Sequence, residues 1–443
     1  MKRITRALIF VLALATVLGS FAGCSTGDRS GGASSGEGKA AESSQAPVEK
    51  KKLTFWYLWG GDEGKTVDAA IKTYNDQSDK YEVEGLSVPD SQKIMTSISA
   101  GNGPDVTDDF SNNVGKYASA GILEPLDDYV KNSGYDLNDF IPTAIQSCQM
   151  DGKLYAMPIS TNLEALYYNK TLLKQAGYNE PPKTMEEMYE MAVKTTKVNS
   201  DGTLDVCGFP DFPAVYYLGN FAAAGGGGWY TDDGKPAPAD SFGNRYALQL
   251  AIDYRKKFGL SNVVKFQSSG KYLDPTDPFL RGKQTFRVDG SWMGKNIKET
   301  FKSDVDYGVT YIPYPKDKPE LKGRGLISSS MLYITSNSKN KEGAWDFVSW
   351  YAGKDGQLAS TLKNGGFPSR LSLLEEETFK KQYDSEFYAE LAKSKNLVTP
   401  PNGPKNGEYD TMVSEQTELC MNLKQDIDTT LKNIYQKGGE ILG

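Results

Sequence analysis

The sequence predicts a mixed α/β fold, and three observations support this prediction. Residues 53–59 are apolar and aromatic, as in a buried strand, and Gly60 and Gly61 follow directly. Apolar residues then recur at helical spacing, at Val67, Ala70, Ile71 and Tyr74. Strand and helix patterns continue to alternate along the chain, whose 443 residues and 38% hydrophobic content allow two or three domains.

Further elements follow in order. Alternating or apolar segments predict strands at residues 81–88, 105–110, 154–158, 164–169, 282–292 and 307–312. Helical periodicity predicts helices at residues 91–100, 184–196, 246–258, 341–352 and 415–435. Thr184, with Glu187 three residues later, is typical of a capping box at a helix start. The sequence shows no internal repeat.

The N-terminus predicts export. Three basic residues precede an apolar run at residues 7–18, which is too short for a membrane span. The run ends in Phe-Ala-Gly-Cys at residues 21–24, which resembles a bacterial lipobox. The resemblance implies a signal peptide at residues 1–23, cleavage before Cys24 and lipidation of Cys24. The alternative is an ordinary signal peptide with an incidental cysteine.

Residues 24–52 are predicted to be the lipidated cysteine and a disordered linker, because this segment is polar and contains almost no large apolar residue. Removing residues 1–23 changes the net side-chain charge from −7 to about −10, since three basic residues leave with them. Such a charge argues against nucleic acid and against electrostatic attachment to anionic lipid.

Histidine is absent from the sequence. This excludes Ser-His-Asp and Cys-His nucleophilic sites, and zinc sites of the HExxH kind. Cys148, Cys207 and Cys420 fit no metal-binding spacing, so buried free thiols are expected, although a disulfide between two of them is an alternative. No cofactor and no metal is expected.

Three glycine- or acid-rich segments are similar to phosphate-, anion- or calcium-binding loops, but each departs from the motif. Residues 60–66 nearly match a phosphate loop, but the glycine spacing is one residue short and two acidic residues would repel phosphate. Residues 225–230 are expected to be a mobile loop that presents Trp229 and Tyr230 rather than an anion site. Residues 199–205 are too short for an EF-hand loop and predict a turn.

Carboxylates gather at the ends of predicted strands, together with aromatic side chains. They are Asp62, Glu63, Asp105, Asp108, Asp109 and Glu164. Two carboxylates suffice for a glycosidase, so an enzyme is chemically possible without histidine. Carboxylates and amides also hold sugar hydroxyls without any reaction, and aromatic rings pack against sugar faces. These residues are therefore compatible with either a sugar-binding cleft or a glycosidase.

Several segments together resemble a known family. They read LTFWYLWGG, SISAGNGPDV, ASAGILEPLDDYV, DGKLYAMPISTNLEALYYNKTLLKQAGYNEPPKTMEEM, FLRGKQTFRVDGSW, YGVTYIPYP and SNSKNKEGAWDFVSWYAG. In this order they resemble the extracellular solute-binding proteins of ABC sugar importers, of the maltose-binding-protein type. The resemblance covers the chain from Leu53 almost to its end.

The resemblance implies a two-lobed, type II periplasmic-binding-protein-like fold, with a ligand cleft between lobes that close by a hinge. Residues 53–159 and 315–365 would form lobe 1. Residues 160–314 and 366–443 would form lobe 2. The hinge crossings would lie near Ser160, Tyr314 and Gly366.

Ligand-binding positions also follow from the resemblance. The first-strand loop would contribute Trp59, Asp62 and Glu63, and Glu63 replaces the lysine of maltose-type members. The second lobe would contribute Trp292 as its stacking ring. The other expected positions are Asp109, Asn112, Thr161, Asn162, Trp229, Tyr230 and Tyr409.

The resemblance implies a binding protein rather than an enzyme: a monomer, lipid-anchored at Cys24 on the extracytoplasmic face of the cell membrane. It would capture an oligosaccharide or another sugar and deliver it to ABC permease subunits. Two alternatives remain. One is an extracellular glycosidase that uses two carboxylates such as Asp109 and Glu164. The other is a lipoprotein that binds a non-sugar solute, for example a peptide, a polyamine or a metal.

Overall fold

The fold is built on one mixed sheet whose strands come from widely separated parts of the chain. The computed structural model describes residues 49–443, which form one compact unit. Within them, eight strands form the sheet, in the order β10-β6-β11-β3-β1-β2, with β9 paired to β6 and β12 paired to β11. The strands are β1 Lys51–Tyr57, β2 Tyr81–Ser87, β3 Val106–Phe110, β6 Met157–Asn169, β9 Phe286–Gly290, β10 Tyr307–Thr310, β11 Gly325–Ile334 and β12 Leu397–Val398.

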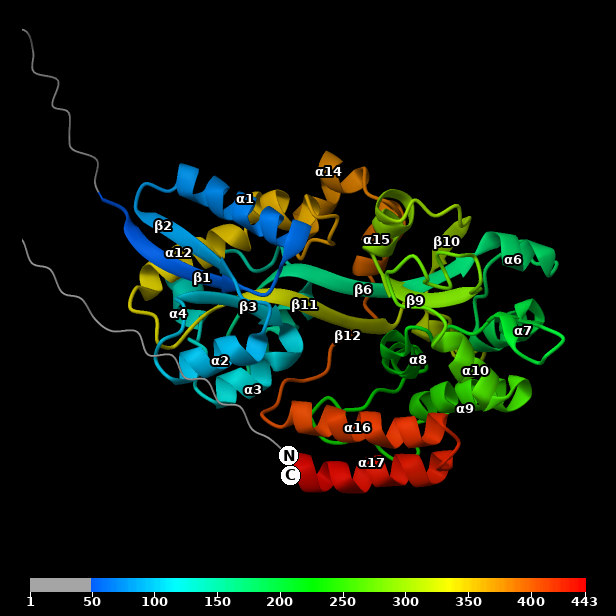
Figure 1. Ribbon diagram of the computed structural model, residues 1–443. Helices are drawn as coiled ribbons and strands as arrows, with labels where there is room; N and C mark the ends of the chain where they lie inside the picture. Colours follow the sequence, from blue (N-terminus) through cyan, green and yellow to red (C-terminus); the bar gives the residue numbers. More distant parts are fainter. Residues whose placement is uncertain (1–48) are drawn as a thin grey trace, which may run out of the picture. The chain divides into compact units, whose positions relative to one another are not determined.

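Two long strands, β6 and β11, connect the two ends of this sheet (Figure 1). Residues 157–163 of β6 pair with β11, whereas residues 164–169 pair with β9 and β10. Strand β11 pairs with β6 at Ile327–Leu332 and with β3 at Ser330–Ile334, with an irregularity between Ser330 and Met331. Each strand therefore passes from one set of neighbours to another near its middle.

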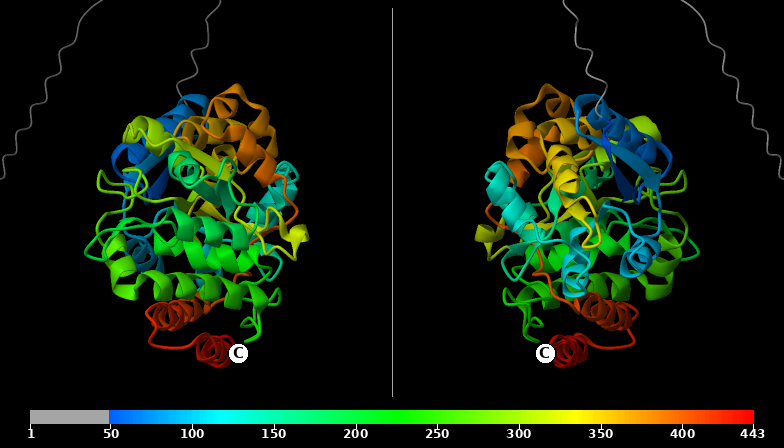
Figure 2. Two further views of the ribbon diagram at one scale, coloured as in Figure 1. Left: turned by 90° about the vertical axis from the view of Figure 1, so that its right-hand side faces the viewer. Right: turned by 90° about the vertical axis from the view of Figure 1, so that its left-hand side faces the viewer.

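Helices pack around the sheet along the whole described chain. They are α1 Gly61–Gln77, α2 Ser91–Ser99, α3 Val114–Ser119, α4 Asp127–Ser133, α5 Pro142–Ser147, α6 Lys170–Gln175, α7 Met185–Thr195, α8 Tyr217–Ala224, α9 Phe242–Phe258, α10 Leu260–Gln267, α11 Met293–Lys295, α12 Lys341–Tyr351, α13 Lys354–Gln357, α14 Glu377–Lys380, α15 Ser385–Ala392, α16 Asn406–Met421 and α17 Ile427–Leu442. Helices α16 and α17 pack on each other and on α9 (Figure 2). No helix in residues 49–443 is both long and apolar enough to cross a bilayer.

The apolar side chains collect in separate cores. The first core draws on residues 53–159 and 331–352, and the second on residues 166–312 and 420–431. A third core contains Tyr167 and draws on residues 141–167, 279–305 and 362–397, together with Ile327 of β11. Strands β6 and β11 therefore contribute side chains to more than one core.

Most of the predicted elements are confirmed, including the capping box at α7, where Thr184 Oγ1 accepts the Glu187 N–H at 3.2 Å. Cys148, Cys207 and Cys420 are buried free thiols, as expected. The first strand begins at Lys51, so two residues assigned to the linker belong to β1.

Three predicted elements differ from the structure. The strand predicted at residues 154–158 is divided between β5, Lys153–Leu154, and the start of β6. The strand predicted at residues 282–292 is shorter, since only Phe286–Gly290 is paired. The helix predicted at residues 415–435 is two helices, because Leu423 adopts a positive φ of 57° and Asp426 caps α17 by accepting the Thr429 N–H at 2.8 Å. The signal peptide, Cys24 and the linker up to residue 48 lie outside the described residues.

The segment that precedes α16 is fixed against α3 and α5. Asn402 Nδ2 donates to the carbonyl oxygens of Ser147 and Gln149, at 2.8 and 2.9 Å. At Gly115, in α3, an added Cβ would lie 2.4 Å from the Gly403 carbonyl oxygen. The absence of a side chain at Gly115 thus allows α3 and this segment to approach closely.

Gly115→Ala should destabilise the protein, because the new methyl group collides with backbone rather than with a flexible side chain. We expect the free energy of unfolding to fall by about 1–3 kcal/mol, as for other overpacked sites. Urea unfolding measures this change. Gly407→Ala is the matched control, since an added Cβ there meets nothing within 4 Å. Equal losses in the two variants would contradict this account of the contact.

Candidate functional site

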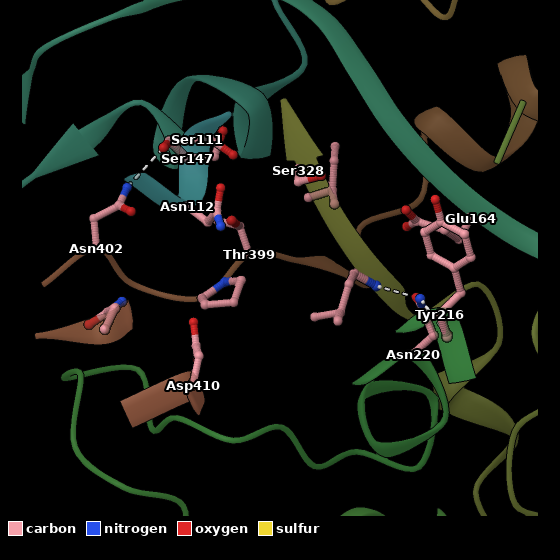
Figure 3. A pocket seen from close by; sticks show the side chains of 14 residues that line it. Ser111, Asn112, Ser147, Glu164, Tyr216, Asn220, Ser328, Thr399, Asn402 and Asp410 are labelled. Carbon is pink, nitrogen blue, oxygen red and sulfur yellow. Dashed lines mark hydrogen bonds between the residues drawn. The ribbon is translucent and has the colours of Figure 1, made fainter. Parts of the chain in front are cut away.

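A pocket of about 250 Å³ lies where β6 and β11 exchange neighbours (Figure 3). Its walls come from η1 (Ser111–Asn113), α5, β6, η2 (Ala214–Tyr216), α8, β11, the segment after β12, and α16. The lining residues are Ser111, Asn112, Ser147, Glu164, Tyr216, Asn220, Leu326, Ile327, Ser328, Thr399, Pro400, Asn402, Asn406 and Asp410. Most of these side chains carry a hydroxyl, amide or carboxyl group, and no lysine or arginine is among them.

One wall is a set of small polar side chains held by the ends of β3 and α5. Ser111 follows β3 directly, and its Oγ accepts the backbone N–H of Ser329 at 3.0 Å. Ser147 Oγ donates to the Ala144 carbonyl at 2.7 Å and lies 3.2 Å from Ser329 Oγ. Asn402 joins this wall through the Ser147 carbonyl (Figure 3). The wall is therefore fixed by hydrogen bonds among its own members and β11.

The opposite wall carries Glu164, Tyr216 and Asn220 (Figure 3). Asn220 is fixed because its Oδ1 accepts the Leu326 N–H at 3.3 Å and its Nδ2 donates to the Tyr216 carbonyl at 3.0 Å. The Tyr216 ring lies 6.2 Å from the Trp292 ring, measured between centroids. An aromatic surface therefore stands beside the polar groups, a combination that is common in small-molecule pockets.

Acidic groups set the electrostatics of the pocket. Burial, and then the nearby Asp289, raises the pKa of Glu164 to about 8. No side chain of another described residue donates a hydrogen bond to the Glu164 carboxyl, so it remains available. Burial also raises the pKa of Asp410, whose Oδ1 accepts the Tyr230 hydroxyl at 2.6 Å. The pocket is thus uncharged or negative near neutral pH.

Four predicted residues lie on the pocket or one contact away from it. Asn112 lines it directly. Asn162 Nδ2 donates to Ser328 Oγ, a lining group, at 3.1 Å. Tyr230 holds Asp410, and Trp292 packs beside Tyr216. The structure brings these four together although they are spread over 180 residues of sequence.

The residues predicted in the first-strand loop lie elsewhere. Asp62 is in the first turn of α1, with a side chain that is 95% exposed and paired with Lys65 at 2.8 Å. Glu63, also in that turn, is exposed and outside the pocket lining. The Trp59 ring packs edge-on against Phe110, at 6.0 Å. The helix begins immediately after Gly60, so both carboxylates belong to its exposed first turn.

Four more predicted residues lie outside the lining: Asp109, Thr161 and Tyr409 are buried, and Trp229 is half-buried. Asp109 is only 3% exposed, and its oxygens accept hydrogen bonds from Tyr117, Asn113 and the Phe110 N–H. Thr161 is buried in β6. Tyr409 is 0% exposed, and its hydroxyl donates to the Trp229 carbonyl at 2.6 Å, so this pair stabilises the base of α16.

Sequence reasoning missed Tyr216, Asn220, Asn402 and Asp410 as site residues, and it noted Glu164 only among the strand-end carboxylates that suit either sugar binding or a glycosidase. A usable signal was present for Asn402, because the segment TPPNGPKNG at residues 399–407 is rich in proline, glycine and asparagine and lacks a strand or helix pattern. Tyr216 and Asn220 carry no such signal, since η2 and α8 look like ordinary apolar segments.

Known proteins resemble this chain over most of its length. The maltotriose-binding protein of Pyrococcus abyssi is 26% identical over 317 residues, which span 69% of this chain and 64% of that protein. The sn-glycerol-3-phosphate-binding periplasmic protein UgpB of Escherichia coli O1:K1 is 24% identical over 424 residues, 88% of this chain and 92% of that protein.

A solved structure, CpMnBP1 with mannobiose bound, has a TM-score of 0.75 and 24% identity, and the match covers 88% of this chain and 100% of that one. This likeness confirms the predicted fold class, the two-lobed α/β fold of periplasmic binding proteins. The profile of a family described as bacterial extracellular solute-binding protein matches residues 69–385. The chain therefore belongs to the bacterial extracellular solute-binding proteins.

Proposed function

We propose that the protein is the substrate-binding component of an ABC transporter, which captures an uncharged sugar or oligosaccharide outside the cell and delivers it to a membrane permease. The observation that carries this proposal is the pocket at the crossing of β6 and β11. Its lining combines hydroxyl, amide and carboxyl groups with the Tyr216 ring, and contains no basic residue. The names of the maltotriose- and mannobiose-binding relatives support it.

The chemistry of the lining suits a sugar. Each sugar hydroxyl can both donate and accept a hydrogen bond, and so can the side chains of Ser111, Asn112 and Ser328. The carboxyl groups of Glu164 and Asp410 can accept from neighbouring hydroxyls. The Tyr216 ring, with Trp292 behind it, can pack against the C–H face of a sugar ring.

An anionic ligand fits this pocket poorly. One relative is named for sn-glycerol-3-phosphate, whose phosphate would need arginine or lysine donors. The described lining offers no such side chain, and two carboxyl groups face the cavity instead. Charge therefore favours an uncharged ligand over a phosphate ester.

We assign the two predicted lobes to the first and second hydrophobic cores. The first core supports lobe 1, residues 53–159 and 315–365, and the second supports lobe 2, residues 160–314 and 366–443. Hinges near Ser160, Tyr314 and Gly366 are consistent with β6 passing between neighbours and with the Thr161 N–H donating to the Phe367 carbonyl at 2.9 Å. A ligand that contacts both lobes favours the closed form by those added contacts.

A binding role accounts for the pocket better than catalysis. The glycosidase alternative used Asp109 with Glu164, but Asp109 lies below the surface and its oxygens bond to neighbouring groups. The two carboxyl groups that line the pocket are Glu164 and Asp410. Incubation with oligosaccharides should therefore release no product. Chromatography of each oligosaccharide before and after incubation with the protein measures this.

We also propose that the protein is a monomer, anchored at the outer face of the cell membrane by lipid on Cys24. The order of basic residues, apolar run and lipobox supports the anchor. The family description places such proteins outside the cell.

A screen of uncharged mono- and oligosaccharides should identify at least one that raises the thermal midpoint of unfolding. A ligand at 100 times its Kd adds about 2.7 kcal/mol of stability, which is readily measured. sn-Glycerol 3-phosphate at the same concentration should give no shift, because the lining offers its phosphate no lysine or arginine donor. Stabilisation by the phosphate ester alone would contradict the proposal.

Two variants test whether the sugar that the screen identifies binds in the pocket. Asn112→Ala should weaken sugar binding about 5-fold in calorimetry, since one hydrogen bond contributes about 1 kcal/mol. Asp62→Asn is the matched control, because Asp62 is exposed and outside the pocket. If Asp62→Asn weakens binding and Asn112→Ala does not, the ligand lies at the first-strand loop instead.

Glu164→Gln should flatten the dependence of stability on pH. The native pKa of Glu164 is raised to about 8, whereas that of an unfolded glutamate is about 4.3. Between these values the native protein keeps a proton that the unfolded chain has released, so stability falls as pH rises. Wild-type protein should therefore lose stability relative to the variant from pH 5 to pH 8 in urea unfolding. The exposed Glu82→Gln should behave as wild type; parallel curves for wild type and Glu164→Gln would refute this assignment.

Cys24→Ser should release the protein from the membrane fraction and abolish metabolic labelling with palmitate, because the lipobox cysteine is the acceptor of lipid. Cell fractionation with immunoblotting measures the first effect and radiolabelling the second. Cys148→Ser is the control, since Cys148 is buried in the folded chain. Continued labelling of Cys24→Ser would show that the anchor lies elsewhere.

A further inference from the structure

Three rings form a surface beside the pocket, which we call the aromatic wall: Tyr216, Tyr272 and Trp292. The Tyr216 ring lies 6.0 Å from the Tyr272 ring, edge-on, and 6.2 Å from the Trp292 ring. Tyr216 lines the pocket, and the half-buried Trp292 lies beside it. The orientation of the wall therefore decides which surface a ligand meets.

Trp292 is held at two points. Its ring lies over Gly290, where an added Cβ would be 2.2 Å from the ring, so the backbone of β9 forms its seat. Its Nε1–H donates to the Tyr272 hydroxyl at 2.9 Å. Tyr272 thus contacts both of the other rings, one through its edge and one through its hydroxyl.

The hydrogen bonds that link Trp292, Tyr272 and Asp289 have only one possible assignment of donors and acceptors. An indole N–H donates and never accepts, so the Tyr272 oxygen is the acceptor. The single Tyr272 proton must then go to a further acceptor, and Asp289 Oδ1 lies 2.8 Å away. Asp289 Oδ1 also accepts the Gly290 N–H at 2.9 Å. One carboxyl oxygen therefore fixes the tyrosine and the backbone on which the tryptophan lies.

Asp289 is not needed to neutralise the buried positive charge of Arg287. Arg287, fully buried, forms a two-pronged ion pair with Asp277, at 2.6 and 3.0 Å. Asp289 Oδ2 lies 3.8 Å from Arg287 and has no hydrogen-bond partner. Burial raises the pKa of Asp289 to about 6, so the fold loses stability by keeping this carboxylate. The close hydrogen bonds of Asp289 are directed toward the aromatic wall.

We propose that Tyr272 and Asp289 are positioning residues for ligand binding, which hold the Trp292 and Tyr216 rings in the orientation that receives a sugar face. This inference rests on the sugar-binding function proposed above. Neither residue lines the pocket: Asp289 acts through Tyr272, and Tyr272 acts through the Trp292 and Tyr216 rings. Arg287 and Asp277 support the base of the arrangement, because the Arg287 guanidinium also lies 5.7 Å from the Tyr272 ring.

A double-mutant cycle tests this role, using calorimetry with the sugar that the screen identifies. Tyr272→Phe removes the hydroxyl and keeps the ring, so we expect a loss of affinity of about 5-fold, the effect of one lost hydrogen bond. In a Trp292→Phe background the same substitution should change affinity less than 2-fold, because Tyr272 no longer has an indole N–H to hold. Equal losses in both backgrounds, or no loss in either, would overturn the proposal.

Asp289 offers a second pair of variants, which serves if Tyr272→Phe fails to fold. Asp289→Asn keeps an oxygen that can accept the Tyr272 proton and should bind within 2-fold of wild type. Asp289→Ala removes the acceptor and should weaken binding about as much as Tyr272→Phe. Equal affinities for the Asn and Ala variants would also overturn the proposal. Tyr311→Phe is the matched control, since Tyr311 bonds to Glu390 and does not line the pocket.

A measurement without ligand separates this inference from the proposed function. The near-ultraviolet circular dichroism band that Trp292→Phe removes should also be weakened in Tyr272→Phe, because a loosened indole loses its fixed asymmetric surroundings. A band unchanged in Tyr272→Phe would refute the positioning role whether or not any sugar binds. If the band weakens and no sugar in the screen binds, the wall is positioned as inferred and the proposed function fails instead.

Discussion

The antiparallel pairing of β6 with β11 is the constraint on which the rest of the described chain depends. These strands are bonded to β3 at one end and to β9, β10 and β12 at the other, so they carry the sheet from one core to the next. Buried ladder bonds are costly to leave unmade, so the register of this pair is held firmly. Glu164 stands where β6 changes partner, and Ser328 faces the same cavity from β11. The pocket is therefore a product of the change of neighbours in the sheet.

Local patterns in the sequence predict most of this fold. The strand and glycine turn before α1, the capping box of α7 and the alternating β2 depend on neighbouring residues only, and all are confirmed. The break between α16 and α17 is different. Leu423 adopts a positive φ of 57° although it is not a glycine, so the residue that usually marks a helix end in a sequence is missing at this break.

The candidate site is less predictable, because contacts there depend on which way each strand end turns. Asp109 and Asn112 are three residues apart, yet the inward face of β3 takes Asp109 into a hydrogen-bonded cluster while η1 presents Asn112 to the pocket. The resemblance to sugar-binding proteins selected Trp292 and Tyr230, which lie near the pocket. It could not select Tyr272 or Asp289, since the hydrogen bonds that join a loop, β9 and Trp292 depend on the tertiary structure.

The pocket takes lining residues from Ser111 to Asp410, which has a consequence for the order in which the protein is made. A chain synthesised from its N-terminus has no complete pocket until α16 exists, because Asn402, Asn406 and Asp410 form one side of the cavity. A fragment that ends before Thr399 lacks that side altogether. A complete pocket is thus a property of the nearly finished polypeptide, since its last lining residue is Asp410 of 443.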